Sequence, residues 1–277
     1  MFHKKQITCG ITGHSGTIGR NLIKSSKKIR FIYFKGNIIN KKDVKNWIKE
    51  NSFEYLIHLA AIVPIREVNK NKKKALLVNT KGTANLVEAI LKNDNTIKWS
   101  FLASTSHVYS SSKKKIKETF SKKPISYYGK TKLFAEQNFI KLKKRKIKVC
   151  IGRIFSTANN SQRANYLVPD LKRRIKNAKK KIKLENLNHY RDFISIKDIV
   201  KILKYFMKNE VKGVYNISSA KKIRLTEIAK IISKHYKKVI TFELNKNPTY
   251  LIGNNFRLRK IYKKKIDTKL KKIIFND

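Results

Sequence analysis

The sequence predicts an α/β protein with a Rossmann-like, doubly wound parallel sheet and a smaller mixed C-terminal lobe. Two observations lead to this prediction. Through the first 155 residues, short apolar segments alternate with amphipathic segments of helical period, which is typical of a parallel sheet with helices on both faces. The first apolar segment also runs directly into a glycine-rich turn, ITGHSGTIGR at residues 11–20, and such a turn between the first strand and the first helix is typical of that fold.

The individual elements follow from apolar runs and helical spacing. Strands are expected at short apolar runs, at residues 6–11, 29–34, 55–61, 99–105 and 148–155. Helices are expected directly after the glycine turn and at residues 44–50, 75–92 and 127–144. Strands therefore alternate with helices, as crossovers between parallel strands require.

Beyond residue 156 this alternation stops. Residues 156–190 are polar and basic with few strand signals. They are followed by RDFISI, a helix around 198–208, a strand at 213–218, a helix from Thr226 and a strand at 239–244. We therefore expect a Rossmann-like domain over residues 1–155. A lobe over residues 156–277 is expected to close over the carboxyl ends of the strands, with some segments returning to the first sheet.

The charge of the chain is extreme, with 67 Lys and Arg against 17 Asp and Glu, a formal net charge of +50. One explanation is attraction to a polyanion, either nucleic acid or an acidic small molecule. The other is that lysine has replaced other exposed residues throughout. The lysine runs are spread along the whole chain, which favours the second explanation.

Cysteine usage and hydropathy limit the class of protein. Cys9 and Cys150 both lie in apolar stretches, so they predict buried free thiols and no disulfide framework or metal site. The first ten residues lack the apolar run of a signal peptide. The longest apolar stretch, LIHLAAIVPI, is too short to span a bilayer. A soluble cytoplasmic protein is therefore expected.

Three glycines in the first turn suggest a bound dinucleotide. Gly13, Gly16 and Gly19 stand three residues apart between a strand and a helix. Glycine accepts positive φ and lets backbone approach a ligand closely, and pyrophosphate binds well at a helix N-terminus. Cofactor contacts are therefore expected at Gly13, Ser15, Gly16, Thr17, Ile18 and Gly19.

A second group of residues has the chemistry of a proton-transfer site. Tyr128 and Lys132 are four residues apart on an expected helix, so they share one face. A lysine ammonium beside a tyrosine hydroxyl favours the phenolate and lowers its pKa from about 10, giving a general acid/base for neutral pH. Thr105 ends the fourth expected strand, at the edge where ligands bind in such sheets, and its hydroxyl can bond a substrate oxygen.

Together these residues resemble the extended short-chain dehydrogenases of the NAD-dependent epimerase/dehydratase family, over nearly the whole chain. The matching segments are TGHSGTIG (12–19), GNI (36–38), HLAA (58–61), NTKGTANLVEA (79–89), STSHVY (104–109), SYYGKTK (126–132), RDFISIKDIV (191–200) and GVYNIS (213–218).

The resemblance implies an enzyme that binds NAD(P) in the first domain and a nucleotide-sugar in the C-terminal lobe. Tyr128 would exchange a proton with the sugar oxygen, Lys132 would tune Tyr128 and hold the nicotinamide ribose, and Thr105 would position the reacting oxygen. The resemblance adds cofactor contacts at Asn37, Ile38, Leu59, Ala60, Ala61 and Asn79. It adds substrate contacts at Ser106, His107, Ser156 and Arg191. In the family, Ser156 is often an Asn that contacts the sugar nucleotide.

The preferred cofactor is expected to be NADP, by a small margin over NAD. An NAD site of this fold uses an acidic residue near the end of the second strand. Here the first acidic residue of the chain is Asp43, well past that strand. The neighbourhood offers basic residues that attract a 2′-phosphate, namely Lys27, Lys28, Arg30 and Lys35.

The expected reaction is a 4-keto reduction or an epimerisation without dehydration. In the dehydratases of the family an Asp–Glu pair follows the catalytic Thr, whereas Ser106 and His107 follow Thr105 here. The alternative is a non-catalytic relative that binds RNA, but the intact set of Thr105, Tyr128 and Lys132 argues against it. A homodimer through the helices at 75–92 and 127–144 is plausible, although Lys72–Lys74 would repel across such an interface.

Overall fold

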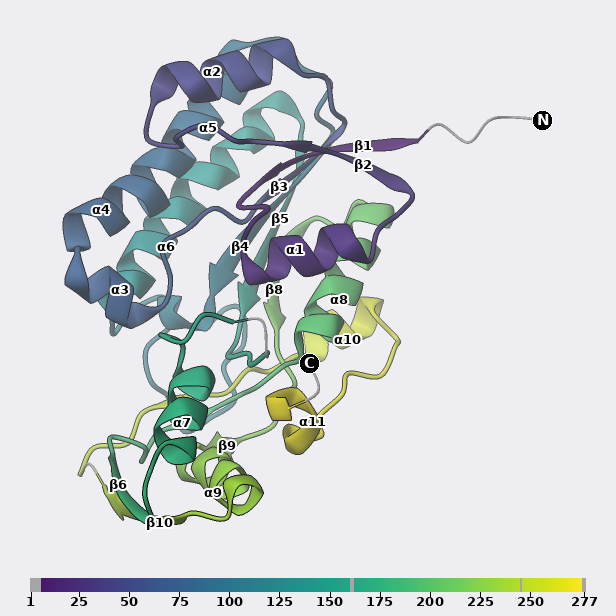
Figure 1. Ribbon diagram of the computed structural model, residues 1–277. Coiled ribbons are helices and arrows are strands. Elements are labelled where there is room, and N and C mark those ends of the chain that lie inside the picture. The colour runs from purple at the N-terminus through teal and green to yellow at the C-terminus, as the bar shows by residue number, and fades with distance from the viewer. Residues whose placement is uncertain (1–5, 160–161, 245, 276–277) are drawn as a thin grey trace.

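The computed structural model describes residues 6–159, 162–244 and 246–275, and its centre is a six-stranded sheet (Figure 1). The strand order is β2-β1-β3-β4-β5-β8, and every neighbouring pair is parallel. The strands are β1 (Ile7–Thr12), β2 (Ile29–Tyr33), β3 (Tyr55–His58), β4 (Trp99–Thr105), β5 (Lys148–Ile154) and β8 (Gly213–Ile217). The predicted doubly wound fold is confirmed.

Helices cover both faces of this sheet. On one face lie α1 (Thr17–Lys24) and α8 (Ile196–Lys208), and on the other lie α2 (Lys41–Glu50), α5 (Gly82–Lys92) and α6 (Tyr127–Phe139). Strand β3 contributes apolar side chains to both faces of the sheet. Ile57 packs with α1 and α8, while Leu56 packs with α2 and α5. Because successive side chains of a strand point to opposite faces, a continuous apolar run buries both of them.

Two helices differ from the predicted spans. The segment expected as one helix over 75–92 begins earlier, as α4 (Lys72–Leu76), passes through a π-turn over Leu77–Lys81 and continues as α5. Helix α6 ends at Phe139 and becomes a 3₁₀ turn over Ile140–Arg145. A further short helix, α3 (Ile65–Lys70), follows the end of β3.

The smaller lobe contains α7 (Leu167–Lys176), α9 (Leu225–Tyr236) and two small sheets. Strand β6 (Lys181–Glu185) pairs with β10 (Val239–Glu243), and β7 (Tyr190–Arg191) lies between β11 (Tyr250–Leu251) and β9 (Ile223–Arg224). Short helices α10 (Phe256–Ile261) and α11 (Leu270–Phe275) complete the chain.

Residues 156–190 carry few strand signals in the sequence, and in this region the structure has α7 and β6. Strand β6 lies in a two-stranded sheet and buries only Leu184, so its other positions are free to be basic or polar. Helix α7 similarly buries Val168, Leu171 and Ile175 while its other face holds arginine and lysine. The basic residues on the exposed faces of α7 and β6 therefore interrupt the apolar pattern from which these elements could have been predicted.

The chain enters the smaller lobe after β5 and then returns to the large sheet. Helix α8 packs against α1, and β8 pairs with β5 at the edge of the sheet. Ile199, Phe206 and Tyr215 share one core cluster with Cys9 and Phe101. The core of the large lobe therefore contains residues from both halves of the sequence.

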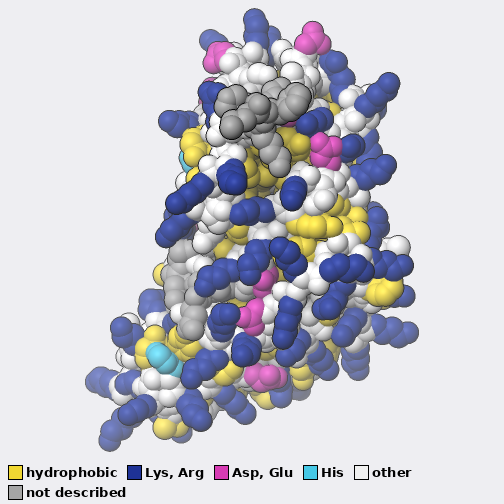
Figure 2. Space-filling model, turned by 90° about the vertical axis from the view of Figure 1, so that its right-hand side faces the viewer, with side chains coloured by type: hydrophobic (Ala, Val, Ile, Leu, Met, Phe, Trp, Pro, Cys, Tyr) yellow, Lys and Arg dark blue, Asp and Glu magenta, His cyan; other side chains and the backbone are white. Residues whose placement is uncertain are grey.

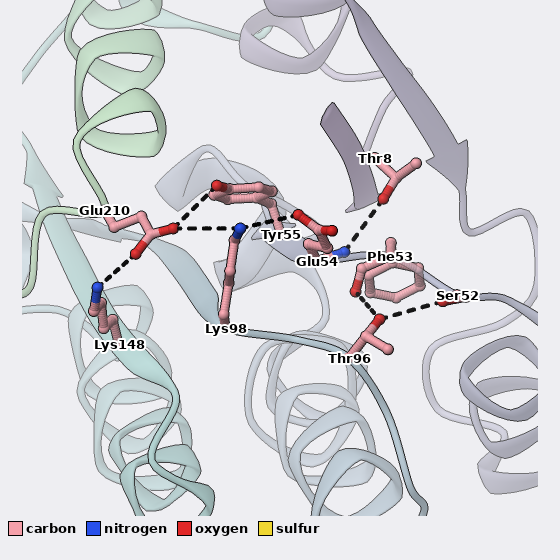
Figure 3. Close-up of polar contacts among 9 residues, drawn as sticks. All are labelled: Thr8, Ser52, Phe53, Glu54, Tyr55, Thr96, Lys98, Lys148 and Glu210. Carbon is pink, nitrogen blue, oxygen red and sulfur yellow. Dashed lines mark hydrogen bonds and ion pairs between the residues drawn. The ribbon is translucent and has the colours of Figure 1, made fainter. Parts of the chain in front are cut away.

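Polar side chains at the amino ends of β3, β4, β5 and β8 form one closed network (Figure 3). Glu210 accepts a hydrogen bond from the Tyr55 hydroxyl at 3.0 Å and pairs with Lys148 at 2.5 Å. Lys98 lies between Glu54 at 3.0 Å and Glu210 at 3.7 Å, over the face of the Tyr55 ring. We call this group the amino-edge network.

Lysine and arginine side chains are spread over the face of the molecule in Figure 2, with few acidic side chains between them. Within the described residues, no helix combines the length and apolar character that crossing a membrane demands. In the same residues, no group of three or more His, Cys, Asp or Glu is placed to hold a metal ion.

Candidate active site

The glycine turn lies between β1 and α1, and two of its glycines are required by geometry. Gly13 has φ +71°, a left-handed conformation, and a Cβ there would lie 2.6 Å from the Ala60 nitrogen. A Cβ on Gly19 would lie 2.6 Å from the Gly13 oxygen. At Gly16, by contrast, a Cβ would approach only the Gly13 oxygen, at 3.3 Å. The turn is therefore packed tightly against β3 and α1 but has room beside Gly16.

The residues of this turn fit a dinucleotide. Thr17 and Ile18 begin α1 and are half-buried, while Ser15 and Gly16 are exposed. Nδ1 of His14 is buried without a hydrogen-bond partner in the described part of the chain, and its ring packs on Tyr33 with centroids 5.1 Å apart. Exposed backbone at a helix N-terminus beside an unsatisfied polar atom suits a phosphate-bearing ligand.

The loop after β2 is held by short polar contacts. The Asn37 nitrogen donates to Asp43 Oδ2 at 2.8 Å, and the Ile39 nitrogen donates to Asn37 Oδ1 at 3.1 Å. Asn85 Nδ2 donates to the carbonyl oxygens of Ile38 and Ile39 at 3.2 and 2.8 Å. This loop therefore has a fixed shape at the carboxyl end of β2, where the sequence predicted contacts from Asn37 and Ile38.

The basic neighbourhood predicted for a 2′-phosphate is largely at the wrong edge of the sheet. Lys27 and Lys28 precede β2, and Arg30 is its second residue, opposite Thr8 near the start of β1. Of the four predicted cations only Lys35 follows the strand. Asp43, expected to be remote, is brought beside Asn37 by its hydrogen bond. Three of the four predicted cations therefore lie away from the carboxyl end of β2, and a carboxylate lies near that end, which disfavours a 2′-phosphate there.

A buried polar chain supports the next stretch, Leu59–Ala61. Thr12 Oγ1 and His58 Nδ1 are 2.6 Å apart, and His58 Nε2 is 2.9 Å from Thr83 Oγ1. The Ala60 nitrogen donates to Thr12 Oγ1 at 3.3 Å. Burial, with a smaller contribution from the charge of Lys132, lowers the pKa of His58 to about 3, so the ring is neutral. All three residues of the stretch are half-buried at the carboxyl end of β3.

Asn79 supports this stretch with its side-chain amide. Its Oδ1 accepts from the Ile62 nitrogen at 2.7 Å, and its Nδ2 donates to the Ile62 oxygen at 3.2 Å and to Thr131 Oγ1 at 3.0 Å. Both amide hydrogens are therefore used. Thr131 in turn donates to the Tyr128 carbonyl at 2.8 Å. Asn79 thus links the segment after β3 to α6, and its contact with the cofactor stays a prediction.

Thr105 and Tyr128 meet at the carboxyl end of β4. Thr105 ends the strand and its Oγ1 accepts from the His107 nitrogen at 3.3 Å. Helix α6 begins at Tyr127 with Ser126 as its cap, and the Tyr128 hydroxyl lies close enough to Thr105 for that side chain to affect its pKa. A Cβ on Gly129 would overlap the His107 carbonyl, so the glycine permits this close approach.

The pKa of Tyr128 is raised in this structure, whereas the sequence predicted a lowered one. Burial raises the pKa of Tyr128, the Thr105 side chain opposes this only in part, and Lys132 is not among the causes. Lys132 is 2% exposed, and burial lowers its own pKa to about 8 while Glu136 raises it. Burial favours the neutral form of both groups, and for the phenol this effect outweighs the others that act on it.

Glu136 and Arg153, which the sequence did not predict as part of the site, are buried behind Lys132. Glu136 Oε1 accepts from Ser104 Oγ at 2.5 Å and from Arg153 Nε at 3.0 Å, and its Oε2 accepts from Arg153 Nη2 at 2.7 Å. Arg153 also donates to the Tyr109 hydroxyl at 2.7 Å. The signal for Glu136 was its position four residues after Lys132, on the same helical face.

His107 and Ser106 form the opposite wall, in the 3₁₀ turn after Thr105. Nδ1 of His107 is buried with no hydrogen-bond partner among the described residues, and its ring lies 5.9 Å from the Tyr128 ring. Burial and the nearby charge of Arg191 lower the pKa of His107 to about 3. The histidine is therefore neutral at physiological pH and has one unsatisfied nitrogen near Tyr128. Ser106 is buried beside it.

The smaller lobe contributes Arg191 and Ser156. Arg191 donates to the carbonyl oxygens of Tyr190 and Thr249 at 2.8 and 3.0 Å, and to Thr249 Oγ1 at 3.0 Å. Burial lowers the pKa of Arg191 to about 10, so it stays charged at neutral pH. Ser156 bridges to Phe193, two residues after Arg191. The structure thus brings Arg191 near His107, while Ser156 lies at the entry to the same lobe.

Two adjoining cavities lie between the segment after β3 and the segment that leads into α7, and Ala61 is the predicted site residue that lines one of them. One, of about 420 Å³, is lined by Ala61–Val63 from the end of β3 and by Arg163 and Asn165 from the segment before α7. In the other, of about 340 Å³, Arg66 of α3 contacts Asp170 of α7 at 3.2 Å. The predicted cofactor stretch and the smaller lobe therefore face one another across open space.

Comparison with known proteins agrees with this architecture. The family model described as GDP-mannose 4,6 dehydratase matches residues 12–268. The chain is also similar to GDP-6-deoxy-D-talose 4-dehydrogenase of Aggregatibacter actinomycetemcomitans, with 30% identity over 214 residues that cover 72% of this chain and 71% of that protein.

Solved structures show the same fold at lower identity. The structure of RMD from Pseudomonas aeruginosa complexed with NADPH has a TM-score of 0.86 at 18% identity, over 97% of this chain and 96% of that chain. UDP-glucose 4-epimerase of Thermus thermophilus in complex with NAD has a TM-score of 0.82 at 16% identity, over 97% and 98%. With the family model spanning most of its length, the chain belongs to the GDP-mannose 4,6 dehydratase family, within the extended short-chain dehydrogenases of the NAD-dependent epimerase/dehydratase type.

Proposed function

We propose that this protein is an NAD(P)-dependent nucleotide-sugar enzyme that reduces a 4-keto-sugar or epimerises the corresponding alcohol. The main support is the placement of Tyr128 beside Thr105 at the carboxyl end of β4, one helical turn from buried Lys132 on α6. The names of its relatives include a 4-dehydrogenase, 4-epimerases and a 4,6-dehydratase, all of sugars linked to nucleotides. Family membership and site chemistry therefore support the same reaction class.

In the proposed mechanism, Tyr128 exchanges a proton with the sugar oxygen while Thr105 holds that oxygen in place. A bound nicotinamide supplies or accepts the hydride. Because burial raises the pKa of Tyr128, the hydroxyl keeps its proton at neutral pH and is ready to donate it to a carbonyl oxygen. This favours the direction of reduction, in which the oxygen gains the proton and the carbon gains the hydride.

Lys132, with a pKa lowered to about 8, provides a partly charged ammonium in the same buried site. We propose that it holds the nicotinamide ribose. Arg191, charged and close to His107, is proposed to bind the diphosphate of the nucleotide-sugar. Ser106, His107 and Ser156 remain the proposed contacts to the sugar.

The absence of dehydration also remains a proposal. Removing water from a sugar needs an acid and a base beyond the groups that transfer hydride. The positions after Thr105 are Ser106 and a neutral His107. Glu136, a buried carboxylate close to Lys132, has both oxygens bonded to Arg153 or Ser104. These residues give no free pair of carboxylates for dehydration.

A homodimer is proposed through the helices at 72–92 and 127–140. Leu76, Phe134 and Ile140 expose large apolar side chains on α4, α6 and the turn after it. Burying them against a second copy would remove apolar area from water and favour the dimer, whereas repulsion between the two copies of Lys72–Lys74 would oppose it.

The function is tested by incubating the purified protein with nucleotide-sugars and each cofactor. Supplied 4-keto-6-deoxy nucleotide-sugars should oxidise NADPH or NADH, seen as loss of absorbance, and give a product heavier by two hydrogens. With dTDP-glucose, GDP-mannose or UDP-N-acetylglucosamine, no product lighter by one water is expected. A dehydrated product would contradict the proposed reaction, and the dissociation constants of NADH and NADPH decide between the two cofactors.

A further inference from the structure

Glu136 is a buried acid that the proposed mechanism does not use. It lies one turn beyond Lys132 on α6, on the same face, and the two side chains are 5% and 2% exposed. Burying a carboxylate costs several kcal/mol unless other groups compensate it. A chain with only 17 acidic residues in 277 has placed one of them behind its proposed catalytic lysine.

The carboxylate of Glu136 is fixed from two strands of the sheet. Ser104 of β4 and Arg153 of β5 supply three hydrogen bonds to its two oxygens, at 2.5, 3.0 and 2.7 Å. Arg153 is itself held by the Tyr109 hydroxyl at 2.7 Å and the Glu118 carbonyl at 3.1 Å. Glu136 therefore cannot turn toward Lys132 without losing these bonds.

Lys132 is faced by groups from three elements. His58 on β3 is neutral, and Tyr128 on α6 is held in its neutral form by burial. The charged groups are Glu136 and, beyond it, Arg153 on β5. Of the two, the carboxylate lies one helical turn away and is the one whose charge acts on Lys132, raising its pKa against the effect of burial.

Lys132 donates no hydrogen bond to another residue in the described part of the chain. Both oxygens of Glu136 are already bonded to Arg153 and Ser104. The lysine thus feels the attraction of a carboxylate without being tied to it in a direct pair. Its three N–H groups stay free for a ligand.

We propose that Glu136 is a positioning residue for Lys132: Arg153 and Ser104 hold its carboxylate behind the lysine, which keeps the ammonium form in the site and leaves its N–H groups free. The use made of that ammonium rests on the proposed function. The electrostatic link between the two residues does not, since it exists in the protein without substrate or cofactor.

Three variants separate the effect of charge from that of packing. Glu136→Gln removes the carboxylate charge but leaves Arg153 unpaired. Arg153→Met removes the cation and leaves Glu136. The double variant removes both, and replacing a whole buried pair by neutral residues is often tolerated by the fold. Glu88→Gln, at an exposed carboxylate on α5, is the matched control.

The readout is the titration of Lys132 in the free protein. Its ¹³Cε resonance, identified by its absence in Lys132→Met, is followed from about pH 6 to about pH 11. The expected order of titration midpoints is Arg153→Met highest, then wild type, then the double variant, then Glu136→Gln. Removing the carboxylate should change the ionisation constant of Lys132 about tenfold, which is one pH unit.

An unchanged midpoint in the double variant would overturn the proposal, because a purely structural role of the pair lowers the melting temperature without moving the titration. If Glu136→Gln does not fold, the double variant and Arg153→Met still give opposite expected shifts. The alkaline limb of kcat/KM should move with the midpoint. The variants could titrate in the expected order while the wild-type protein reduces no keto-sugar. That outcome would refute the proposed function and leave the positioning role of Glu136 standing.

Discussion

At the amino edge of the central sheet, charged side chains pair with one another, whereas at the carboxyl edge two buried histidine nitrogens have no partner among the described residues. In the amino-edge network, Glu54 and Glu210 pair with Lys98 and Lys148, and the Tyr55 hydroxyl donates to Glu210. The lysines on either side of Glu210 lower the pKa of that carboxyl, so it is charged under ordinary conditions.

The carboxyl edge leaves buried polar atoms unsatisfied. Nδ1 of His14 and Nδ1 of His107 have no partner among the residues described, and Lys132 donates to none of them. Native proteins pair nearly all buried polar atoms, so an unpaired nitrogen in the glycine turn and another beside Tyr128 suit a ligand that completes the bonding. The side chains at the amino ends of these strands therefore stabilise the fold, whereas those at the carboxyl ends are placed to bind a ligand.

The largest expected effect comes from the carboxyl edge. Tyr128→Phe keeps the ring and removes the hydroxyl that lies beside Thr105. Turnover of a keto-sugar should fall by roughly 10²-fold or more, the scale of lost acid/base catalysis, with little change in cofactor affinity. Tyr127→Phe, at the preceding residue where Lys72 lies over the ring, is the control. Equal turnover in the two variants would remove Tyr128 from the mechanism.

The second effect is a loss of stability in acid that originates at the carboxyl edge. Burial lowers the pKa values of His58 and His107 to about 3, so the folded protein keeps both rings neutral. Unfolded histidine titrates near about 6.5, so below that pH the unfolded chain binds protons that the folded one does not. As the pH falls from about 6.5 to about 3, each histidine should lower the free energy of unfolding by about 1.4 kcal/mol per pH unit.

Asp192 works in the opposite direction over part of this range. Burial raises the pKa of its carboxyl to about 6, so between that pH and about 4 the folded protein binds the extra proton. The decline in stability should therefore be steepest just below about pH 6.5 and shallower below about pH 6. Urea unfolding at several pH values measures both slopes. His107→Gln should reduce the decline and His235→Gln, at an exposed site, should not; equal slopes in all three proteins would refute this account.

The smallest effect is expected at the amino edge. Glu210→Gln should lower the free energy of unfolding by about 1 kcal/mol, because its pairs are partly exposed and screened by solvent. Turnover should not change, since the network lies at the opposite end of the strands. Urea unfolding and keto-sugar reduction are measured side by side, with Glu50→Gln at the exposed end of α2 for comparison. A tenfold loss of turnover would show that the two edges are not independent.

How much the sequence predicts depends on the distance along the chain between the partners. The glycine turn and the placement of Thr105, Tyr128 and Lys132 follow from local spacing and from strands ending at a common edge. The contact of Asp43 with Asn37 depends on how the loop after β2 folds back. The pairing of Glu136 with Arg153 depends on how α6 is seated on β5. Neither contact can be predicted from the spacing of apolar residues in the sequence.

The misplaced cations show a second limit. Lys27, Lys28 and Lys35 are close in sequence, but a strand of five residues separates them, and a strand rises about 3.3 Å per residue. Residues that look like neighbours on paper therefore stand at opposite ends of β2. Composition alone gave no way to distinguish them, because lysine occurs at both ends.

The return of the chain to the large sheet has a consequence for synthesis on the ribosome. The edge of β5 stays uncovered until β8 (Gly213–Ile217) has left the exit tunnel. The face of the sheet that carries α1 likewise keeps its apolar side chains exposed until α8 (Ile196–Lys208) has been synthesised. A nascent chain that ends near residue 155 thus presents an open strand edge and an uncovered apolar surface, both of which favour aggregation. The N-terminal half is therefore expected to depend on chaperones during translation, and a fragment of residues 1–155 to be insoluble when expressed alone.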